Sequence, residues 1–361
     1  YKGAICMSEQ QYSDKPLAYL DQNILDLFTE PQCLLKKDSE LFNFLKNEVQ
    51  AVYSPTTLEE IYRSVINGKS SVYGLAFLDV LKELNAHFIT LIIENGEVTN
   101  TIFRSWEEPL IHFNQFVENN YLNKFVHPLR NNLFAIFGGI KDFNKLENEQ
   151  IDNLNNLLIF LESSLKFLES CEDKDEYILS EIEKYKVEIP KLRMQQKEYE
   201  SFVQLSVQHL EDANKEQAAH KKFRDSLKVD LNHLRKIEFP NVLVQIWKML
   251  QQNNAELVNF ELDDFFQLKK GFNSESEFYI FQKVNQIYTM LNLIGYHQDE
   301  GIHKKEKRFI ASFSDMSHAS YACFCEYLFT RDKNFSIKVR VAYEYLNVAT
   351  QIVNIEVNST P

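Results

Sequence analysis

The strongest constraint on the fold is that strand-like and helix-like segments alternate at both ends of the chain but not in its middle. From about Lys15 to Asn100, helical segments separate short apolar runs at 16–23, 50–53 and 87–93. From about Lys304 to Val357 the alternation returns, with strands expected at 327–330 and 350–357. Strands separated by helices are typical of a single parallel sheet. We therefore predict an α/β fold in which both ends of the chain contribute strands to one sheet.

The middle of the chain has helical periodicity. It is rich in Leu, Glu, Lys, Asn and Gln, and glycine is almost absent between Lys141 and Lys270. Few chain breakers over such a length favour long helices, with a break or kink expected at Pro190. We predict a large all-helical insertion at 101–303 and a discontinuous core at 15–100 and 304–361. An insertion in a surface loop costs only about 0.6 kcal/mol of closure entropy for each doubling of its length.

Composition restricts the class of protein. The 361 residues include 28 Phe and 17 Tyr, which argues against a disordered chain. The net charge of −13 disfavours bulk binding of nucleic acid, but a local basic patch or a bound cation can reverse the field at a site. The five Cys are odd in number and lack zinc-site spacing, which indicates reduced thiols in a cytoplasmic protein. No apolar run reaches the ~20 residues needed to span a membrane.

Acidic residues follow the predicted strands at corresponding positions. Asp21 directly follows the first strand, and Asp332 follows the strand at 327–330 after one residue. Glu59 and Glu60 lie early in the helix after the second strand, and Asp315 is expected at the start of the helix that leads into 327–330. The carboxyl ends of parallel strands meet at one edge of a sheet, so these side chains can converge there.

Four carboxylates in a small cleft repel one another and raise each other's pKa, and a divalent cation relieves that repulsion. Oxygen ligands select Mg²⁺ or Mn²⁺ rather than zinc. One or two such ions can activate water and stabilise the leaving oxygen in phosphodiester hydrolysis. The alternative is structural, because any single Asp after a strand is more often a turn residue or a helix cap. Ser314 or Ser312 is the expected cap beside Asp315.

Four segments, "YLDQN", "SPTTLEEI", "SDMSHASYA" and "LFTRDKNF", resemble the acidic motifs of the PIN domain, a metal-dependent nuclease fold. The resemblance covers roughly 15–100 and 304–357, and the long insertion departs from the usually compact family. It implies five parallel strands in the order third, second, first, fourth, fifth (3-2-1-4-5). It also implies that the catalytic residues and metal ligands are Asp21, Glu60, Asp315 and Asp332.

The resemblance also suggests supporting roles for three neighbours of these acids, and helical spacing adds a fourth. Glu59 is the fallback for Glu60, Thr330 would orient a carboxylate or phosphate, and Asn23 would hydrogen-bond near the metal. His318 lies three residues after Asp315 on the same helix face, where it would support the acids or bind a substrate phosphate. A packed or capping histidine is an equally good interpretation of His318.

Basic residues cluster in sequence beside the third and fourth acids. They are predicted to form a rim that binds a nucleic-acid backbone, and comprise Lys304, Lys305, Lys307, Arg308, Arg331 and Lys333, continued by Lys338 and Arg340. The alternative is an ordinary solvated start of a helix.

Together these features predict a metal-dependent nuclease with Mg²⁺ or Mn²⁺ as cofactor, acting on RNA rather than DNA. The insertion would cover the cleft, bind a protein partner or self-associate. A role as a toxin or an anti-phage effector is suggested by association alone. The alternative from another class is a non-catalytic scaffold that acts through the insertion. Retention of all four acids favours the nuclease, because a scaffold gains nothing from carboxylates that repel one another.

Overall fold

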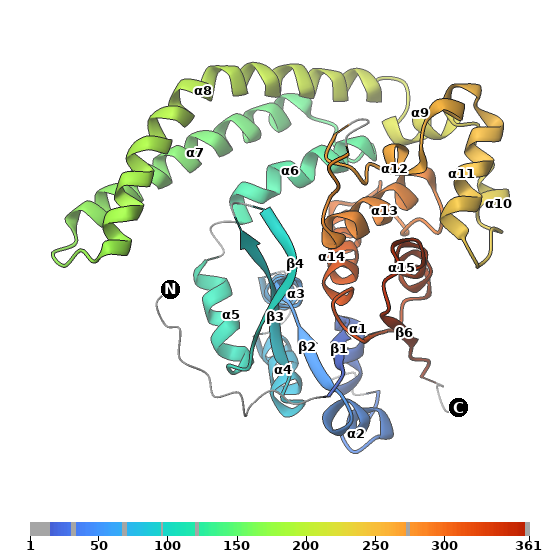
Figure 1. The fold of residues 1–361 in the computed structure, drawn as a ribbon, viewed down its shortest axis with the longest axis horizontal. Helices are drawn as coiled ribbons and strands as arrows, with labels where there is room; N and C mark the ends of the chain where they lie inside the picture. Colours follow the sequence, from blue (N-terminus) through green and yellow to red (C-terminus); the bar gives the residue numbers. More distant parts are fainter. Residues whose placement is uncertain are drawn as a thin grey trace. The chain divides into compact units, whose positions relative to one another are not determined.

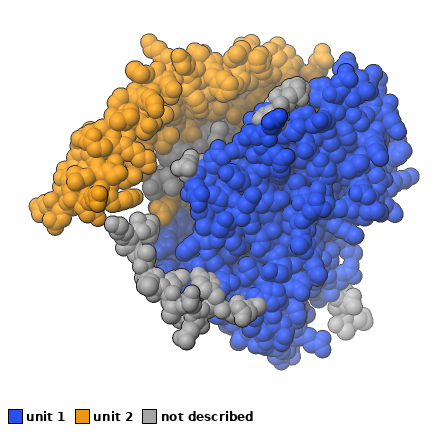
Figure 2. Space-filling view, in the orientation of Figure 1, with its two compact units in different colours: residues 1–118, 227–299, 310–361 blue, residues 119–226, 300–309 orange. Residues whose placement is uncertain are grey.

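The chain forms two compact units (Figure 2). The computed structural model describes residues 15–29, 34–66, 71–94, 97–119, 123–271 and 275–357. The first unit contains the described residues within 1–118, 227–299 and 310–361, and the second contains those within 119–226 and 300–309. This division differs from the predicted core and insertion, since 227–299 belongs to the same unit as both ends of the chain.

The first unit is built on a six-stranded sheet with the order β4-β3-β2-β1-β5-β6 (Figure 1). Its strands are β1 (Leu17–Leu20), β2 (Gln50–Tyr53), β3 (His87–Glu94), β4 (Glu97–Ser105), β5 (Tyr327–Thr330) and β6 (Gln351–Asn354). Neighbouring strands are parallel except β3 and β4. The α/β class with strands from both ends of the chain is confirmed. β1 pairs with β5, so segments some 300 residues apart in sequence lie side by side.

The predicted strand order is wrong as stated, because it lacks the antiparallel edge strand β4. This strand pairs with β3 from Phe88 opposite Ser105 to Glu94 opposite Glu97. We assigned the chain from Thr101 onward to helix, although Val98, Thr99, Thr101 and Ile102 are β-branched residues that favour strands. The side chains of β4 are half-buried or exposed, so it lacks the apolar run that marks the inner strands.

Helices flank the sheet and complete the core of the first unit. They are α1 (Gln22–Leu25), the 3₁₀ turn η2 (Asp26–Phe28), α2 (Glu40–Asn47), α3 (Pro55–Ile66), α4 (Ser71–Glu83), α5 (Pro109–Glu118), α10 (Leu231–Leu234), α11 (Val242–Asn253), η4 (Ala255–Asn259), α12 (Leu262–Phe265), α13 (Ile280–Ile294), α14 (Glu306–Ala322) and α15 (Lys333–Leu346). α14 begins in the second unit and continues into the first. Strands β1, β2 and β5 are nearly fully buried, and Leu20, Tyr53 and Phe329 join one apolar cluster with Phe77 and Leu81 of α4.

The helix that carries Asp315 starts earlier than predicted. α14 begins at Glu306, so Asp315 lies well inside it and neither Ser312 nor Ser314 is a cap. The predicted start was wrong because the basic stretch was placed just before the helix, whereas residues from Glu306 onward already belong to it. Asp315, Ser312 and Ser314 therefore project from a continuous helix, which fixes their relative directions.

The second unit consists of long helices packed on one another. They are α6 (Asn123–Ile136), α7 (Phe143–Ser170), α8 (Glu176–Asn214) and α9 (Ala219–Ser226). A small core joins Ala135, Leu146, Val203 and Val207. Pro190 lies inside the 39-residue α8 without ending it. Figure 1 shows that α8 bends along its length, and a proline within a helix provides a physical cause.

The predictions on membranes and cysteines concern features outside the sheet. Among the described helices, none combines the length and apolar character required to cross a membrane. Cys171, Cys323 and Cys325 are free thiols. Cys6 and Cys33 lie outside the described residues.

Candidate active site

Asp21 lies at the carboxyl end of the central strand because the backbone ladder continues one residue beyond β1. Tyr19 pairs with Val52 on one side and Leu328 on the other. The Asp21 N–H then donates to the Phe329 carbonyl at 3.1 Å, and α1 begins at the next residue. The Asp21 side chain is 6% exposed, so its charge must be satisfied within the protein.

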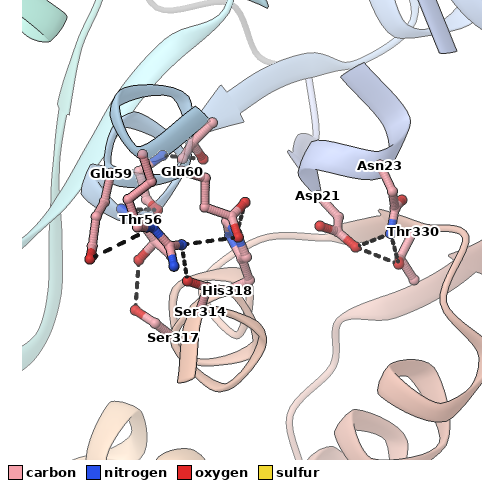
Figure 3. A network of polar contacts seen from close by, with 12 residues as sticks. Asp21, Asn23, Thr56, Glu59, Glu60, Ser314, Ser317, His318 and Thr330 are labelled. Atoms are coloured by element: carbon pink, nitrogen blue, oxygen red, sulfur yellow. Dashed lines mark hydrogen bonds and ion pairs between the residues drawn. The ribbon is translucent and has the colours of Figure 1, made fainter. Parts of the chain in front are cut away.

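Asn23 and Thr330 satisfy one oxygen of Asp21 (Figure 3). Asp21 Oδ2 accepts hydrogen bonds from Asn23 Nδ2 at 2.5 Å and from the Thr330 hydroxyl at 2.7 Å. The Thr330 hydroxyl also accepts from Asn23 Nδ2 at 3.2 Å and from the Asp332 N–H at 3.1 Å. The side-chain oxygen Asn23 Oδ1 accepts from the Arg331 N–H at 2.9 Å. The first and fourth acidic motifs are thus joined by direct hydrogen bonds, which leave Asp21 Oδ1 open among the described residues.

A second buried chain of contacts leads to Glu60. His318 is fully buried on α14, and its Nε2 donates to Glu60 Oε2 on α3 at 3.0 Å. His318 Nδ1 shares a 2.7 Å hydrogen bond with the hydroxyl of Tyr19, which in turn shares one of 2.6 Å with Ser54. The structure therefore places His318 in contact with Glu60, which corresponds to the supporting role that we considered for it from sequence. The ring is fully buried, and both of its nitrogens are engaged, by Glu60 and by Tyr19.

Arg63 is a cation of the site that the sequence argument missed. Its guanidinium lies 3.4 Å from Glu60 Oε1 and 4.0 Å from Glu59, and Nη2 donates to Ser314 Oγ at 2.5 Å. The signal was present, because Glu59, Glu60 and Arg63 have the i, i+4 and i, i+3 spacing of helical ion pairs. Figure 3 shows Glu59, Glu60 and Ser314 gathered between α3 and α14.

Burial and neighbouring charges shift the pKa values of three of the acids, Asp21, Glu60 and Asp315. Burial raises the pKa of Asp21, and the charges of Glu60 and Asp332 raise it further. Burial also raises the pKa of Asp315 well above its usual range, with added contributions from Asp299, Asp21 and Glu60. Burial opposes ionisation of Glu60 as well, but His318 and Arg63 outweigh it and lower its pKa. Burial lowers the pKa of His318, yet Glu60 and Asp21 together raise it above the ordinary value.

The fourth acid, Asp332, has a structural role of its own. Its side chain is exposed and caps α15, where Oδ1 accepts from the Phe335 N–H at 2.9 Å. This is the cap that we weighed against metal binding at the sequence level. The cap occupies one carboxylate oxygen and leaves Oδ2 open among the described residues. A pocket of about 640 Å³ lies beside this oxygen, and its lining includes Asn23, Arg331 and Asp332.

A further ion pair lies beside Asp315. Lys338 is fully buried on α15 and forms an ion pair with Asp299. Our sequence argument placed Lys338 in a basic rim, and that placement is wrong because the side chain is not at the surface. Asp299 was missed altogether, since it lies in a loop between α13 and α14 with no motif around it.

The other predicted basic residues are divided between the two units. Exposed side chains at 304, 305, 307 and 308 belong to the second unit. Arg331 and Lys333 belong to the first, where Lys333 lies 2.7 Å from Glu356. Arg340 stacks on the ring of Phe239, with 4.1 Å between the guanidinium carbon and the ring centroid.

The donor set suits a hard divalent cation in its chemistry. All four acids offer oxygen. Burial, with smaller contributions from neighbouring charges, raises the pKa of Asp21 and Asp315, and a bound cation would favour their ionised forms. Within the described ranges, no three His, Cys, Asp or Glu side chains are arranged to hold an ion by themselves. Mg²⁺ usually binds through one or two carboxylates and keeps several waters, so a closed protein cage is not required.

Comparisons of the chain with protein-family models, curated proteins and solved structures gave no significant match. The assignment of function therefore depends on the residues and geometry of this chain.

Proposed function

We propose that the protein is a metal-dependent nuclease with a PIN-like core, acting on RNA in preference to DNA. The observation that carries the proposal is that the Thr330 hydroxyl hydrogen-bonds to the Asp21 carboxylate and to the Asp332 N–H, which joins the first and fourth of the acids Asp21, Glu60, Asp315 and Asp332 at one edge of the sheet. These residues come from both ends of the chain, and Asp21 responds to the charges of Glu60 and Asp332 while Asp315 responds to those of Asp21 and Glu60. Burial raises the pKa of Asp21 and Asp315, so their charged forms are costly for stability, which favours a functional reason for them.

The residues of the chain have separable roles in this proposal. Asp21 and Asp332 would each offer the carboxylate oxygen that is left open by Thr330 and by the cap of α15. Asp315 would be the third ligand, and the proton that its raised pKa favours would be released on binding. His318 and Arg63 hold Glu60 in place and keep it ionised. A bound Mg²⁺ or Mn²⁺ would activate water and stabilise the leaving oxygen.

The test is cleavage of a labelled single-stranded RNA, with a DNA of the same sequence, in Mn²⁺ and in EDTA. We expect Mn²⁺-dependent cleavage of the RNA, and a loss of at least 100-fold for Asp315→Asn and Asp332→Asn. The matched control is Asp79→Asn, which makes the same change at an exposed position of α4 in the same unit. Cleavage that persists in EDTA and in both site variants would refute the proposal. Preference for the DNA would refute only the substrate assignment.

A second candidate function, a non-catalytic interaction protein, is favoured by one observation on the second unit. The long helices α7 and α8 expose Phe167, Met194 and Phe202, which are each more than 60% accessible. Isolated exposed apolar residues are common, but three large ones on two helices also suit a binding surface. Loss of Mn²⁺ binding together with a measurable protein partner for α7 and α8 would favour this candidate over the nuclease.

A further inference from the structure

Two basic segments come together in the second unit, although they are far apart in sequence. They are α9 and 300–309, which both belong to that unit. Together they hold seven basic and three acidic side chains, whereas the chain as a whole has a net charge of −13. The basic ones are Lys221, Lys222 and Arg224 in α9, and Lys304, Lys305, Lys307 and Arg308 in 300–309. Such a concentration of positive charge in an acidic protein requires a physical reason.

A junction of aromatic and histidine rings fixes the two segments against each other. The ring centroids of His220 in α9 and His303 in 300–309 lie 5.9 Å apart. Phe137, directly after α6, bridges the two segments, because its ring centroid lies 5.5 Å from that of His220 and 6.3 Å from that of Phe309. Phe137, His220 and Phe309 are buried. The segments therefore meet through packed side chains and not through their long surface lysines.

The junction brings cations of both segments to one place on the surface. Lys221 directly follows His220, Lys304 directly follows His303, and both lysines are exposed. Burial lowers the pKa of His303, and the charges of Lys304 and Lys221 lower it further, as expected where cations from both segments face one ring. Among the described residues, no carboxylate forms an ion pair with either lysine. An external polyanion would relieve the repulsion between these cations.

We propose that α9 and 300–309 form one surface that binds the phosphate backbone of single-stranded RNA. The identification of the anion as RNA rests on the nuclease function proposed above, whereas the surface itself needs no catalysis. Lysine and arginine bind a phosphate backbone by displacing its condensed counterions, so the binding weakens steeply with salt. The acidic remainder of the chain repels the same backbone, which confines the RNA to this surface.

A lipid surface is the other polyanion that a basic cluster can bind. Helices that lie on a membrane bury large apolar side chains in it, beside their basic residues. In α9 and 300–309, which are described throughout, no large apolar side chain is exposed, and Ile302 and Phe309 are buried. The two segments therefore lack the apolar residues that would hold them in a bilayer, which favours RNA.

The test measures binding of a labelled, unstructured RNA to the full chain in EDTA, where a metal-dependent nuclease is silent. Lys221→Gln with Lys222→Gln removes two charges from α9, and Lys304→Gln with Lys305→Gln removes two from the other segment. At about 0.1 M salt, each double variant should bind the RNA at least tenfold more weakly than wild type. The slope of log Kd against log salt concentration should fall by about 1.4 in each, as expected for two lost phosphate contacts on a single strand.

Lys184→Gln with Lys197→Gln is the matched control, because it removes two charges from exposed positions of α8 in the same unit and should bind like wild type. Equal affinities of the site variants and this control would overturn the proposal. Weakening in only one site variant would also overturn it, since the segments would then not act as one surface. The same holds if wild type fails to bind RNA, or binds phosphatidylserine vesicles in its place.

The result can be told apart from failure of the nuclease function. RNA binding that responds as expected to both site variants, without Mn²⁺-dependent cleavage, would support this surface and reject the nuclease. Cleavage by wild type, with RNA binding unchanged in both site variants, would support the nuclease and reject this surface. All six substituted lysines are exposed or half-buried, so the variants should fold, which circular dichroism will check.

Discussion

The Thr330 hydroxyl is the contact through which the two ends of the chain meet at the candidate site, and its removal is a demanding test. Thr330→Val keeps the shape of the side chain and the β-branch that suits β5. It removes a donor to Asp21 Oδ2 at 2.7 Å, and an acceptor for Asn23 Nδ2 at 3.2 Å and for the Asp332 N–H at 3.1 Å. The side chain is fully buried, so water cannot replace these bonds without rearrangement.

The expected cost follows from these three bonds. A hydrogen bond to a charged group contributes about 1.5 to 3 kcal/mol, and a donor left unsatisfied by burial costs about 1 to 3 kcal/mol. Asn23 Nδ2 keeps its bond to Asp21, which limits the second contribution. We therefore expect Thr330→Val to lower the free energy of unfolding by about 2 to 4 kcal/mol. For a domain of this size that is a fall of roughly 5 to 10 °C in Tm.

The measurement is thermal unfolding of wild type, Thr330→Val, Asp21→Asn and the double variant in EDTA at pH 7.5. A double-mutant cycle isolates the bond between Thr330 and Asp21, and we expect a coupling energy of about 1.5 kcal/mol or more. Thr330→Ser is the control, because it keeps the hydroxyl and loses only a methyl group. A Thr330→Val variant within about 0.5 kcal/mol of wild type would refute the reasoning, as would additive effects in the cycle.

Three further predictions concern residues of α14. Asp315→Asn should stabilise the EDTA-treated protein at pH 7.5, because the pKa of Asp315 is raised and its charged form therefore destabilises the fold. In a pH series of Tm measurements, this gain should vanish as the pH falls toward the ordinary Asp pKa of about 3.9. His318→Gln should cost more stability at pH 6 than at pH 9. A histidine with a raised pKa stabilises the fold below about pH 6.5, and that contribution is lost as the pH rises through the folded-state pKa. An equal loss of stability at both pH values would contradict the ion pair with Glu60. Ala319→Leu should cost about 1 to 3 kcal/mol in urea unfolding by overpacking a fully buried position whose carbonyl accepts from Tyr343, and the exposed Ala349→Leu serves as its control.

Five of the six strands could be predicted from sequence because each contains a short apolar run. β1, β2, β5 and β6 fall within the segments expected for them, and β3 extends one residue beyond its segment, to Glu94. β4 could not be recognised in this way, because its half-exposed side chains form no such run and its stability comes from pairing with β3. We also could not predict from sequence that 227–299 belongs to the same unit as the sheet, since this depends on α11 and α13 packing against α15. Local periodicity shows that a helix is amphipathic but not which neighbour covers it.

The positions of the acids were predictable for a reason that does not extend to their counter-ions. Asp21 and Asp332 follow strands, so topology alone brings them to one edge of the sheet. Lys338 and Arg340 look alike in sequence, yet one is buried against Asp299 and the other stacks on Phe239. Lysine is almost always exposed, so a sequence argument assigns both to the surface. Burial reverses the meaning of the charge: at the surface Lys338 would attract an anion such as a phosphate, whereas in the core it neutralises Asp299. The counter-ions of such acids are therefore set by tertiary packing, which local sequence patterns do not encode.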